Sequence, residues 1–479
     1  MRQSDMNPNQ HEAKPQSPRA VVVGGGLAGL AAAAELQAAG MNVHLVEGRR
    51  RCGGRAASFE SGSGGLVDAC QHVAMGCCTN FLDLCRQAGL AGSLRRDRTL
   101  WFIGPDGRRA ACTPAGWLPA PFHLTPLLFG MRHFSLREKV ALARGMLQLA
   151  AEPSPGSRPN DAELTAATWL AERQPERVVQ LFWQPVIESA LGESIDYVGV
   201  SAVQKVVVDG FLAHPQSADL LVPTLPLGDL FGEHLVAWLQ SSGVTVTTGQ
   251  LVTGVEREPA GLVTGVRLGE EVVPADLVVL AVPWRAAARL VPDLLPPVDD
   301  SFVGSPITAV HLWYDRPIID LPHAVLVGRV SQWVFPGEAS TTAGEHHCQV
   351  VISASRGLCD GDRERLLATV VKELRDVFPA AAEAHLVRSR IVTDPTAVLS
   401  VRPGIDQVRP CAETTVSNLF LAGDWVATGW PSTMEGAVRS GRQAAAAACQ
   451  QVGLKTPGVV ADLPKNWLIR LLTAASAKH

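Results

Sequence analysis

The clearest pattern of apolar positions lies near the start of the chain. Residues 20–23 (AVVV) form a short apolar run rich in β-branched side chains, which predicts a buried strand. A glycine-rich turn over residues 24–29 follows, and then a helix of small apolar residues that ends at Gly40. Residues 42–47 (NVHLVE) predict a second strand. Together these segments predict a strand–turn–helix–strand unit.

The middle of the chain shows mixed patterns. Residues 229–283 predict a helix, a strand, a small antiparallel meander and a buried strand (ADLVVLAVP) that rejoins the first sheet. Residues 96–215 predict helices with many large apolar side chains. Residues 300–410 alternate as strands do and include one amphipathic helix over residues 362–379.

A second strand-to-helix junction lies almost 400 residues after the first. Residues 418–422 (NLFLA) predict a strand that runs through Gly423 and Asp424 into a turn and a helix of small residues. We expect Ser432 to be the N-cap of that helix. Ser432 and Glu435 have the spacing of a capping box, so Glu435 either satisfies backbone N–H groups or contacts a cofactor.

The first junction has the chemistry of a dinucleotide site. Gly24, Gly26 and Gly29 let the backbone turn and approach a pyrophosphate, whose charge faces the helix N-terminus. Glu47 ends the second strand, where its carboxylate can accept a hydrogen bond from a ribose hydroxyl. Strand, helix, spacing and acidic residue agree, which favours dinucleotide binding over a purely structural turn.

A second glycine pair favours FAD over NAD. Gly54 and Arg55 belong to a Gly-Gly-Arg that follows Glu47, and large flavoproteins commonly carry this tripeptide there. By that resemblance the glycines let the chain pass the cofactor and Arg55 supports its phosphates. We expect the second junction to hold the other end of the flavin. The further predicted cofactor contacts are Gly423, Asp424, Glu435 and Gly436 at this junction, and Val252, whose strand lies where such folds often present backbone atoms to adenine.

These segments predict an α/β fold with a discontinuous domain plan. A Rossmann-like FAD-binding domain of the GR2 flavoprotein type is interleaved with an α+β substrate domain. The expected FAD-binding domain comprises residues 19–95, 218–295 and 411–455, and the substrate domain residues 96–217 and 296–410. Residues 1–18 are a predicted disordered tail, and residues 456–479 a C-terminal tail with a candidate interfacial helix.

Composition narrows the class of protein further. The chain has 479 residues, 47% of them hydrophobic, and a net charge of −4, which gives no global field for nucleic acid. Its ten cysteines form no C-x-x-C pair, so we expect no metal site and a cytoplasmic protein with reduced thiols. No apolar run approaches the ~20 residues that span a bilayer. A peripheral contact with the inner face of the cell membrane stays open.

Motifs from both ends and the centre resemble one flavoprotein superfamily. The GxGxxG–Glu–GGR start, the meander and the AGD…TMEGAVRSG end resemble the amine-oxidase/phytoene-desaturase superfamily. Finer motifs, among them QPERVVQLFWQPVIESAL, SPITAVHLWYDRP and ATGWPSTMEGAVRSG, are similar to the squalene-associated FAD-dependent desaturases, which are hydroxysqualene dehydroxylases. In one departure, Ala69 and Cys70 stand where many relatives have Asn-Gly.

This resemblance implies a reductive step in bacterial squalene and hopanoid synthesis. Hydroxysqualene and reduced FAD would give squalene, water and oxidised FAD. It therefore implies a hydrophobic C30 isoprenoid substrate, and a flavin reductant that the sequence does not identify. Hydroxide leaves poorly, so a proton donor is expected beside the flavin. His72 is the candidate donor, assisted by Gln71, and its alternative is a hydrogen bond to FAD or the backbone. Glu188 is an alternative acid, although a glutamate on the surface of a helix is the commoner case.

Aromatic rings can stabilise a cation that develops on the substrate. The candidate rings of a substrate pocket are Trp183, Trp333 and Trp430. Each of these side chains has the alternative of ordinary core packing. The sequence leaves the use of all three rings open.

Three other functions compete with the reductive dehydroxylase. An oxidising carotenoid or isoprenoid desaturase needs the same pocket with the opposite electron flow. A flavin amine oxidase is less favoured, because such sites often enclose the amine between tyrosines and the chain has only Tyr197 and Tyr314. A prenyl-lipid carrier without flavin is opposed by the intact glycine and acidic motifs.

Two segments are candidates for contact with a membrane surface. Residues 122–139 (FHLTPLLFGMRHFSLREK) combine an apolar run with Arg132, His133, Arg137 and Lys139. Residues 464–479 (PKNWLIRLLTAASAKH) form a shorter candidate. Ordinary core packing with solvated charges is the alternative for both.

Overall fold

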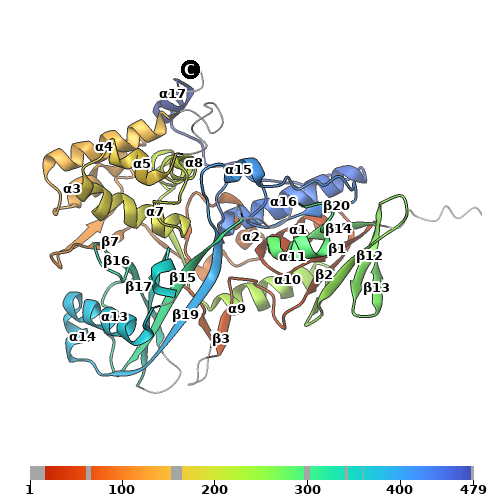
Figure 1. The fold of residues 1–479 in the computed structure, drawn as a ribbon, viewed down its shortest axis with the longest axis horizontal. Helices are drawn as coiled ribbons and strands as arrows, with labels where there is room; N and C mark the ends of the chain where they lie inside the picture. The colour runs from red at the N-terminus through yellow and green to blue at the C-terminus, as the bar shows by residue number, and fades with distance from the viewer. Residues whose placement is uncertain are drawn as a thin grey trace, which may run out of the picture.

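The computed structural model describes residues 17–60, 66–152, 164–295, 302–339, 344–359 and 361–475. The predicted tail over residues 1–18 therefore lies outside the described residues, except for its last two. Figure 1 shows two lobes side by side, joined by the long strands β15 (Gly304–Tyr314) and β19 (Leu386–Leu399). We call them the cofactor lobe and the second lobe.

The cofactor lobe is built on a five-stranded parallel sheet of order β10-β2-β1-β14-β20. The register pairs Val22 of β1 with Leu45 of β2 and with Val279 of β14. The predicted return of the ADLVVLAVP strand to the first sheet is therefore confirmed. The strands are β1 (Arg19–Val23), β2 (Asn42–Glu47), β10 (Thr245–Thr248), β14 (Leu277–Leu280) and β20 (Leu419–Leu421).

The two faces of this sheet bury alternate residues. Ala20 and Val22 face one hydrophobic cluster with helices α1, α10 and α16, while Val21 and Val23 face the meander, as strand alternation requires. The helices are α1 (Leu27–Ala38), α10 (Leu235–Ser241) and α16 (Met434–Gln451). The meander strands are β11 (Val252–Arg257), β12 (Val263–Leu268) and β13 (Glu271–Pro274), as the sequence predicts.

The second lobe contains a seven-stranded sheet of order β19-β15-β18-β17-β16-β7-β8. Its remaining strands are β7 (Leu100–Ile103), β8 (Arg109–Cys112), β16 (Ala324–Leu326), β17 (Trp333–Ala339) and β18 (His346–Ile352). Helices α13 (Arg363–Val377) and α14 (Pro379–Glu383) cover one face. Asp362 caps α13, whose buried Leu366, Val370 and Leu374 recur at helical spacing, so the predicted amphipathic helix is confirmed.

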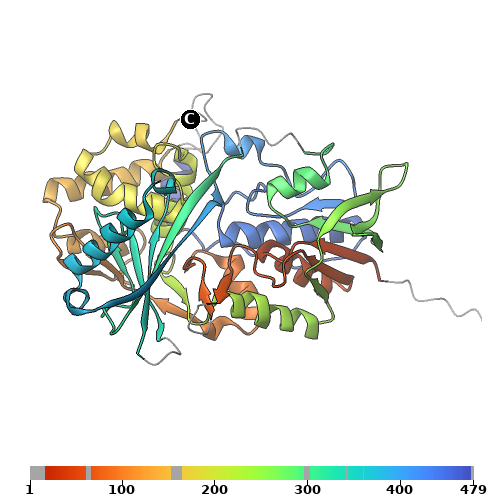
Figure 2. The ribbon, with the colours of Figure 1, turned by 60° about the horizontal axis from the view of Figure 1, so that its bottom comes forward.

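A group of helices lies at the other end of the second lobe (Figures 1 and 2). These are α3 (Thr125–Gly130), α4 (Leu136–Ala150), α5 (Ala166–Ala171), α6 (Glu176–Val178), α7 (Gln184–Leu191) and α8 (Val200–Val207). Wider π-helical turns adjoin α6 and α8 at Val179–Trp183 and Val208–Leu212. Helix α17 (Trp467–Ala475) packs beside α4.

Shorter elements connect the lobes. They are β3 (Ser58–Glu60), β4 (Leu66–Asp68), β5 (Ala74–Met75), α2 (Thr79–Gln87), β6 (Leu94–Asp97), β9 (Leu220–Pro223), α9 (Leu227–Asp229), α11 (Trp284–Leu290), α12 (Arg356–Cys359) and α15 (Ile405–Val408). The parallel sheet between helices and a meander confirms the predicted α/β class. The predicted domain boundaries stay a prediction.

Candidate cofactor site and substrate face

The glycine-rich turn after β1 needs two of its glycines for packing. Gly24 has a φ of +107°, and a Cβ there would lie 2.4 Å from the Ala281 carbonyl oxygen. A Cβ on Gly29 would lie 1.9 Å from the Gly24 carbonyl oxygen. Larger residues at either position would force the turn away from β14, so these glycines fix the shape of the loop.

Gly26 and Gly54 have a different use, because the two glycine-rich segments pass close to each other here: a Cβ on Gly54 would lie 3.0 Å from the Gly26 Cα. The nearest atom to a Cβ built on Gly26 is the Gly54 Cα, at 3.9 Å. Gly26 is also the N-cap of α1, with no side-chain cap and no acidic residue in the first turn. The free N–H groups and the positive end of α1 are therefore available to an anion. This arrangement fits the pyrophosphate of FAD.

Glu47 ties the turn to the end of β2. Its Oε2 accepts a hydrogen bond from Gly25 N at 2.6 Å, and its Oε1 accepts one from Arg49 N at 2.7 Å. Buried Val252 lies nearby, since Gln250 N donates to the Glu47 carbonyl oxygen at 3.2 Å. The two predicted contacts for the adenosine end of FAD are therefore at the same edge of the sheet. Their contact with the cofactor itself stays a prediction.

The two junctions meet through an ion pair. The Arg55 guanidinium pairs with Asp424, and it also donates to the Ala397 carbonyl oxygen at 2.8 Å. Ser432 donates its hydroxyl to the same carboxylate. Burial alone would raise the pKa of Asp424, but Arg55 and Ser432 outweigh it and hold that pKa below its ordinary value. We expect this charged group to hold the flavin side of the cofactor.

The N-terminus of α16 contradicts the predicted capping box. The N-cap is Thr433, whose hydroxyl accepts from Gly436 N at 3.1 Å. Ser432 is unavailable for that role because it binds Asp424 and accepts from Leu399 N at 3.1 Å. The spacing alone could not separate two adjacent hydroxyl residues.

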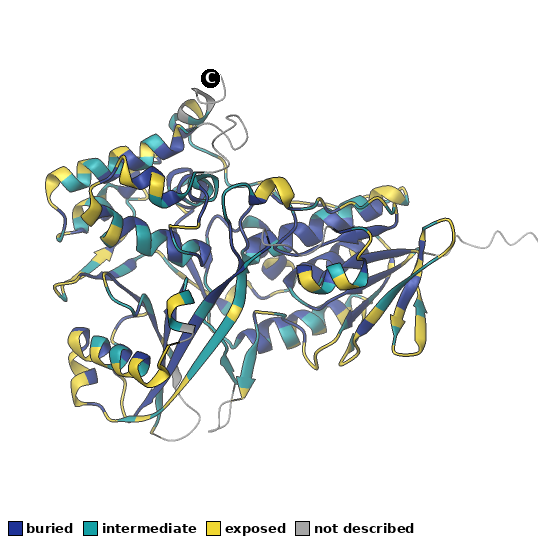
Figure 3. Cartoon of the chain, in the orientation of Figure 1, coloured by how far each residue is buried: buried dark blue, intermediate teal, exposed yellow. Residues whose placement is uncertain are grey.

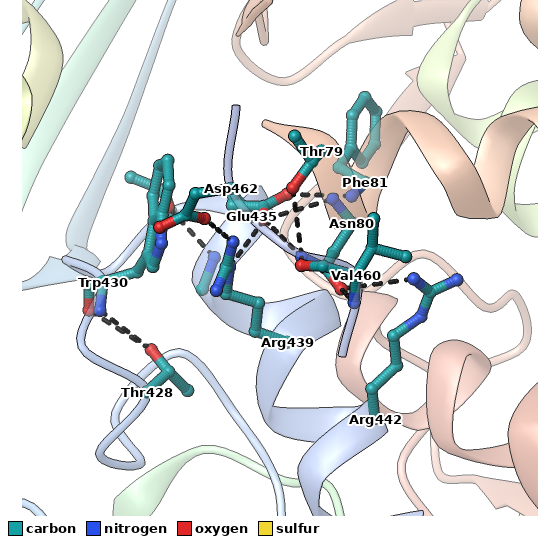
Figure 4. Close-up of polar contacts among 12 residues, drawn as sticks. Thr79, Asn80, Phe81, Thr428, Trp430, Glu435, Arg439, Arg442, Val460 and Asp462 are labelled. Atoms are coloured by element: carbon teal, nitrogen blue, oxygen red, sulfur yellow. Dashed lines mark hydrogen bonds and ion pairs between the residues drawn. The ribbon is translucent and has the colours of Figure 1, made fainter. Parts of the chain in front are cut away.

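Glu435 faces α2 instead of a cofactor (Figure 4). Its carboxylate accepts from Asn80 N at 3.1 Å and Phe81 N at 2.8 Å, the first turn of α2, and pairs with Arg439 at 2.7 Å. The side chain has no exposed surface. The predicted cofactor contact of Glu435 is therefore wrong. The predicted contact of Gly436 has no such replacement and stays a prediction, as does that of Gly423, whose N–H donates to Ser440 Oγ at 2.7 Å.

His72 and Gln71 lie between β4 and β5. The His72 Nδ1 is 2.8 Å from the Cys70 carbonyl oxygen, so this nitrogen carries the proton of the neutral ring. Burial lowers the pKa of His72, and Arg55 lowers it further. The Gln71 side-chain amide donates to the His72 carbonyl oxygen at 3.3 Å. Their proximity to Arg55 agrees with a place on the flavin side.

A buried polar cluster behind this segment is not apparent from the sequence. Gln349 of β18 accepts from Gln71 N and lies 3.2 Å from His311 Nδ1 on β15. His311 in turn lies 3.2 Å from His347 Nε2. Burial lowers the pKa of His311 to about 4 and that of His347 to about 3. Both rings are therefore neutral at physiological pH, and the cluster supports the backbone that carries His72.

Comparison with known proteins identifies the fold and the cofactor class. A family model described as flavin-containing amine oxidoreductase matches residues 27–449. The chain belongs to this family. It is an FAD-dependent oxidoreductase, and the predicted resemblance and cofactor are confirmed.

Individual relatives cover most of this flavoprotein. The hydroxysqualene dehydroxylase of Rhodopseudomonas palustris is 29% identical over 434 residues, which cover 88% of this chain and 96% of that protein. The zeta-carotene desaturase of Synechocystis sp. is 25% identical, with 90% of this chain and 96% of that protein covered. The solved cyclohexylamine oxidase from Brevibacterium oxydans has a TM-score of 0.67 and 19% identity, covering 91% and 100% of the two chains. This structural likeness shows the fold.

The three predicted pocket tryptophans of the flavoprotein have different surroundings. Trp183 has no exposed surface and donates to Gln174 Oε1 at 3.1 Å, so it is a core residue, which contradicts the pocket prediction. The Trp430 ring has Lys205 Nζ 4.5 Å and Arg439 Cζ 4.9 Å from its centroid. Two cations already lie beside this ring, and its role toward a substrate cation stays a prediction.

Trp333 differs from the other two tryptophans in its surroundings. It is half-buried on β17, and its ring lies parallel to that of Phe335 with centroids 5.6 Å apart. Its indole N–H donates to Ser189 Oγ at 2.8 Å. Strand alternation places Trp333 and Phe335 on the sheet face opposite α13, which faces away from the cluster around Val334. The role of Trp333 toward a substrate stays a prediction.

Glu188 is buried, which the interpretation as a surface side chain of a helix did not foresee. It lies on α7 next to Ser189, and its Oε1 accepts from Gln184 Nε2 at 3.0 Å. Gln332, the residue before Trp333, has its Nε2 3.4 Å from Glu188 Oε2. Burial raises the pKa of this carboxyl group to about 7. A carboxyl group that retains its proton near neutral pH thus lies beside the sheet face that carries Trp333 and Phe335. We call this face the aromatic face.

Two negative findings apply to the described ranges. No group of three or more His, Cys, Asp or Glu side chains in them is arranged to hold a metal ion. None of their helices is both long enough and apolar enough to cross a bilayer.

Proposed function

We propose that the chain catalyses the reductive dehydroxylation of hydroxysqualene to squalene, in bacterial squalene and hopanoid synthesis. The observation that carries the proposal is the likeness to hydroxysqualene dehydroxylases over 434 residues, which spans both lobes. Both tyrosines lie outside the aromatic face, which disfavours an amine site. Tyr314 is buried against the α13 side of the sheet, and Tyr197 lies beside Arg356 and Arg402.

The reaction replaces a C–O bond of the substrate by a C–H bond. Bound reduced FAD supplies the hydride. The departing hydroxyl takes a proton and leaves as water, so hydroxysqualene and reduced flavin give squalene, water and oxidised flavin. A separate reductant restores the flavin. The protein residues that hold the cofactor are the Gly26–Gly54 pair, Glu47 and the Arg55–Asp424 pair.

The proton donor to the hydroxyl has two candidates, His72 and Glu188, and their charge states differ. Neutral His72 already donates its Nδ1 proton to the Cys70 carbonyl oxygen, which leaves a lone pair on Nε2. Glu188 has a carboxyl pKa of about 7 and therefore carries a transferable proton over much of the neutral range. We propose Glu188 as the donor and His72, with Gln71, as a positioning pair.

The deciding experiment is an anaerobic single turnover. The bound flavin is reduced chemically, hydroxysqualene is added, and flavin absorbance and extracted products are followed. Reoxidation with one squalene per flavin is expected. Bleaching of the oxidised enzyme by a saturated isoprenoid bond would instead identify a desaturase. Protein that never binds flavin would indicate a lipid carrier.

Two variants test the roles proposed for Gly26 in flavin binding and for Glu188 in proton donation. Gly26→Val places a side chain where only the Gly54 Cα is near, so the fold should persist while flavin is lost. Glu188→Gln should retain flavin and slow reoxidation by about 100-fold, a typical effect of removing a general acid. An unchanged rate in Glu188→Gln with a slowed His72→Ala would return the donor role to His72.

A further inference from the structure

One helix of the second lobe is apolar on two opposite sides. Leu142 and Leu149 of α4 are buried against the protein interior. On the other side Leu136 is 68% exposed, Val140 60% and Leu147 41%. The spacing of these exposed residues follows one side of a helix. An amphipathic helix of a globular protein needs only the inner apolar side. The exposed apolar side therefore indicates a surface that contacts a partner.

Two neighbouring helices, α3 and α17, also carry exposed large apolar side chains, and Figure 3 colours parts of the α4 ribbon as exposed. Phe129 of α3 is 59% exposed, and α17, which packs beside α4, exposes Trp467 by 66% and Leu471 by 60%. A hollow of about 480 Å³ lies between α3 and α4. We call this surface, formed by the exposed residues of α3, α4 and α17, the apolar face.

The charges around the apolar face are predominantly basic. The hollow is lined by Lys139 and Arg144 and by no carboxylate. Arg137 on α4 and Arg470 on α17 are exposed as well. The nearby Glu138 is engaged within the protein, because it forms the capping box of α4 with Ser135 and pairs with Arg177 at 2.8 Å. Apolar side chains with a basic rim complement a layer of anionic headgroups over hydrocarbon.

We propose that the apolar face docks on the surface of an anionic lipid bilayer. The helices α4 and α17 lie on the bilayer without crossing it, with Leu136, Val140 and Leu471 among the acyl chains. Trp467 suits the boundary between headgroups and hydrocarbon. The capping box holds the first turn of α4, and with it Leu136, in place. The need for such a surface rests on the proposed function, since a C30 isoprenoid is dissolved in the bilayer.

The proposal is tested by flotation of the flavin-loaded protein with vesicles. Phosphatidylglycerol–phosphatidylcholine vesicles are expected to carry the protein, and pure phosphatidylcholine vesicles to carry several-fold less. The double variant Leu136→Glu/Val140→Glu should lose at least about tenfold in vesicle affinity, because it places two charges in the apolar contact. Val272→Glu is the matched control, since Val272 is 43% exposed on β13 in the other lobe.

A second double variant tests how much the basic side chains contribute to vesicle binding. Arg137→Gln/Arg144→Gln should weaken binding to phosphatidylglycerol vesicles by about 30-fold, the equivalent of roughly 1 kcal/mol for each of the two basic residues, with little change on phosphatidylcholine. Equal flotation of the wild type and the Leu136→Glu/Val140→Glu variant would overturn the proposal. A concentration-dependent dimer in sedimentation that this variant abolishes, without vesicle binding, would assign the face to a second copy.

Failure of the proposed function is distinguishable from failure of this inference. Flotation requires no turnover, so it reports docking whatever the substrate. Turnover of detergent-dispersed hydroxysqualene should be equal in the wild type and in Leu136→Glu/Val140→Glu. Vesicle-embedded substrate should be converted more slowly by the variant alone.

Discussion

Asp424 and Glu435 are two buried carboxylates of the same junction, and their surroundings differ. Asp424 is bound to Arg55, the residue after Gly54, whose side chain is 35% exposed. Glu435 is enclosed by α2, Arg439 and, through Arg439, Asp462 of the C-terminal segment (Figure 4). One carboxylate faces the cofactor site and the other joins two helices.

The difference shows that a family motif can serve two purposes at once. Asp424 brings a charge to the place where the two glycine junctions meet. Glu435 satisfies the first N–H groups of α2 and neutralises Arg439, so that α16 is fixed against α2. Asp424 of the AGD segment therefore serves the cofactor site, and Glu435 of the MEG segment chiefly holds α16 against α2.

The largest expected effect is the loss of stability in Glu435→Gln. The change leaves Arg439 with less compensating charge in a buried place and directs an amide N–H₂ toward the donors of α2. Removing one partner of a buried pair typically costs about 3–5 kcal/mol of unfolding free energy. Urea unfolding of the flavin-free protein measures it, with the exposed Glu258→Gln as control. A loss below about 1 kcal/mol would contradict the structural role.

Asp424→Asn should affect FAD affinity more than the free energy of unfolding. The variant keeps the shape of the side chain but removes the charge that pairs with Arg55, so FAD binding should weaken by about 10- to 100-fold, the equivalent of a lost charged hydrogen bond. The unfolding free energy of flavin-free protein should fall less than in Glu435→Gln, since Arg55 is partly solvated. Flavin fluorescence titration measures the affinity. Unchanged affinity with a large loss of stability would reverse the comparison.

The pH dependence of Asp424 sharpens the same comparison. Its folded pKa is lowered, so its contribution to stability is present above the unfolded pKa of about 3.9 and is lost as pH falls through the folded value. The difference in unfolding free energy between wild type and Asp424→Asn should therefore be steady above about pH 5 and shrink as the pH falls from about 4 toward the folded pKa. A difference that stays constant over this range would show that the charge of Asp424 is not what stabilises the site.

The smallest effects separate two adjacent hydroxyl residues. Thr433→Ala removes the N-cap of α16 and should cost about 1 kcal/mol of stability without changing FAD affinity. Ser432→Ala removes the hydroxyl that binds Asp424 and should weaken FAD binding by a few-fold. Urea unfolding and flavin titration on both variants distinguish them. An exchange of the two phenotypes would support the Ser432 cap that the spacing predicts.

Local signals in the sequence sufficed for the parallel sheet and for the cofactor class. Gly24, Gly26, Gly29 and Glu47 act within one short segment, so their pattern and their geometry coincide. The meander over β11–β13 was equally predictable, because alternation and turn residues are local properties.

Contacts between distant segments could not be predicted in this way. Glu435 binds Asn80 and Phe81, and nothing in the residues beside Glu435 indicates that α2 begins there. His311, His347 and Gln349 come together only because β15 pairs with β18. Trp183 and Glu188 look alike as helix residues, yet the first is enclosed in the core and the second lies beside Trp333, a distinction that packing alone decides.

The order of strands in the parallel sheet has a consequence for synthesis on the ribosome. β1 emerges first, but its neighbour β14 follows only after helices α3 to α8 of the second lobe, and β20 with Asp424 follows after strands β15 to β19. Arg55 therefore cannot pair with Asp424 until nearly the whole polypeptide has been translated. A nascent or prematurely terminated chain lacks half of the flavin site, so acquisition of the cofactor becomes a sign that translation has run to completion.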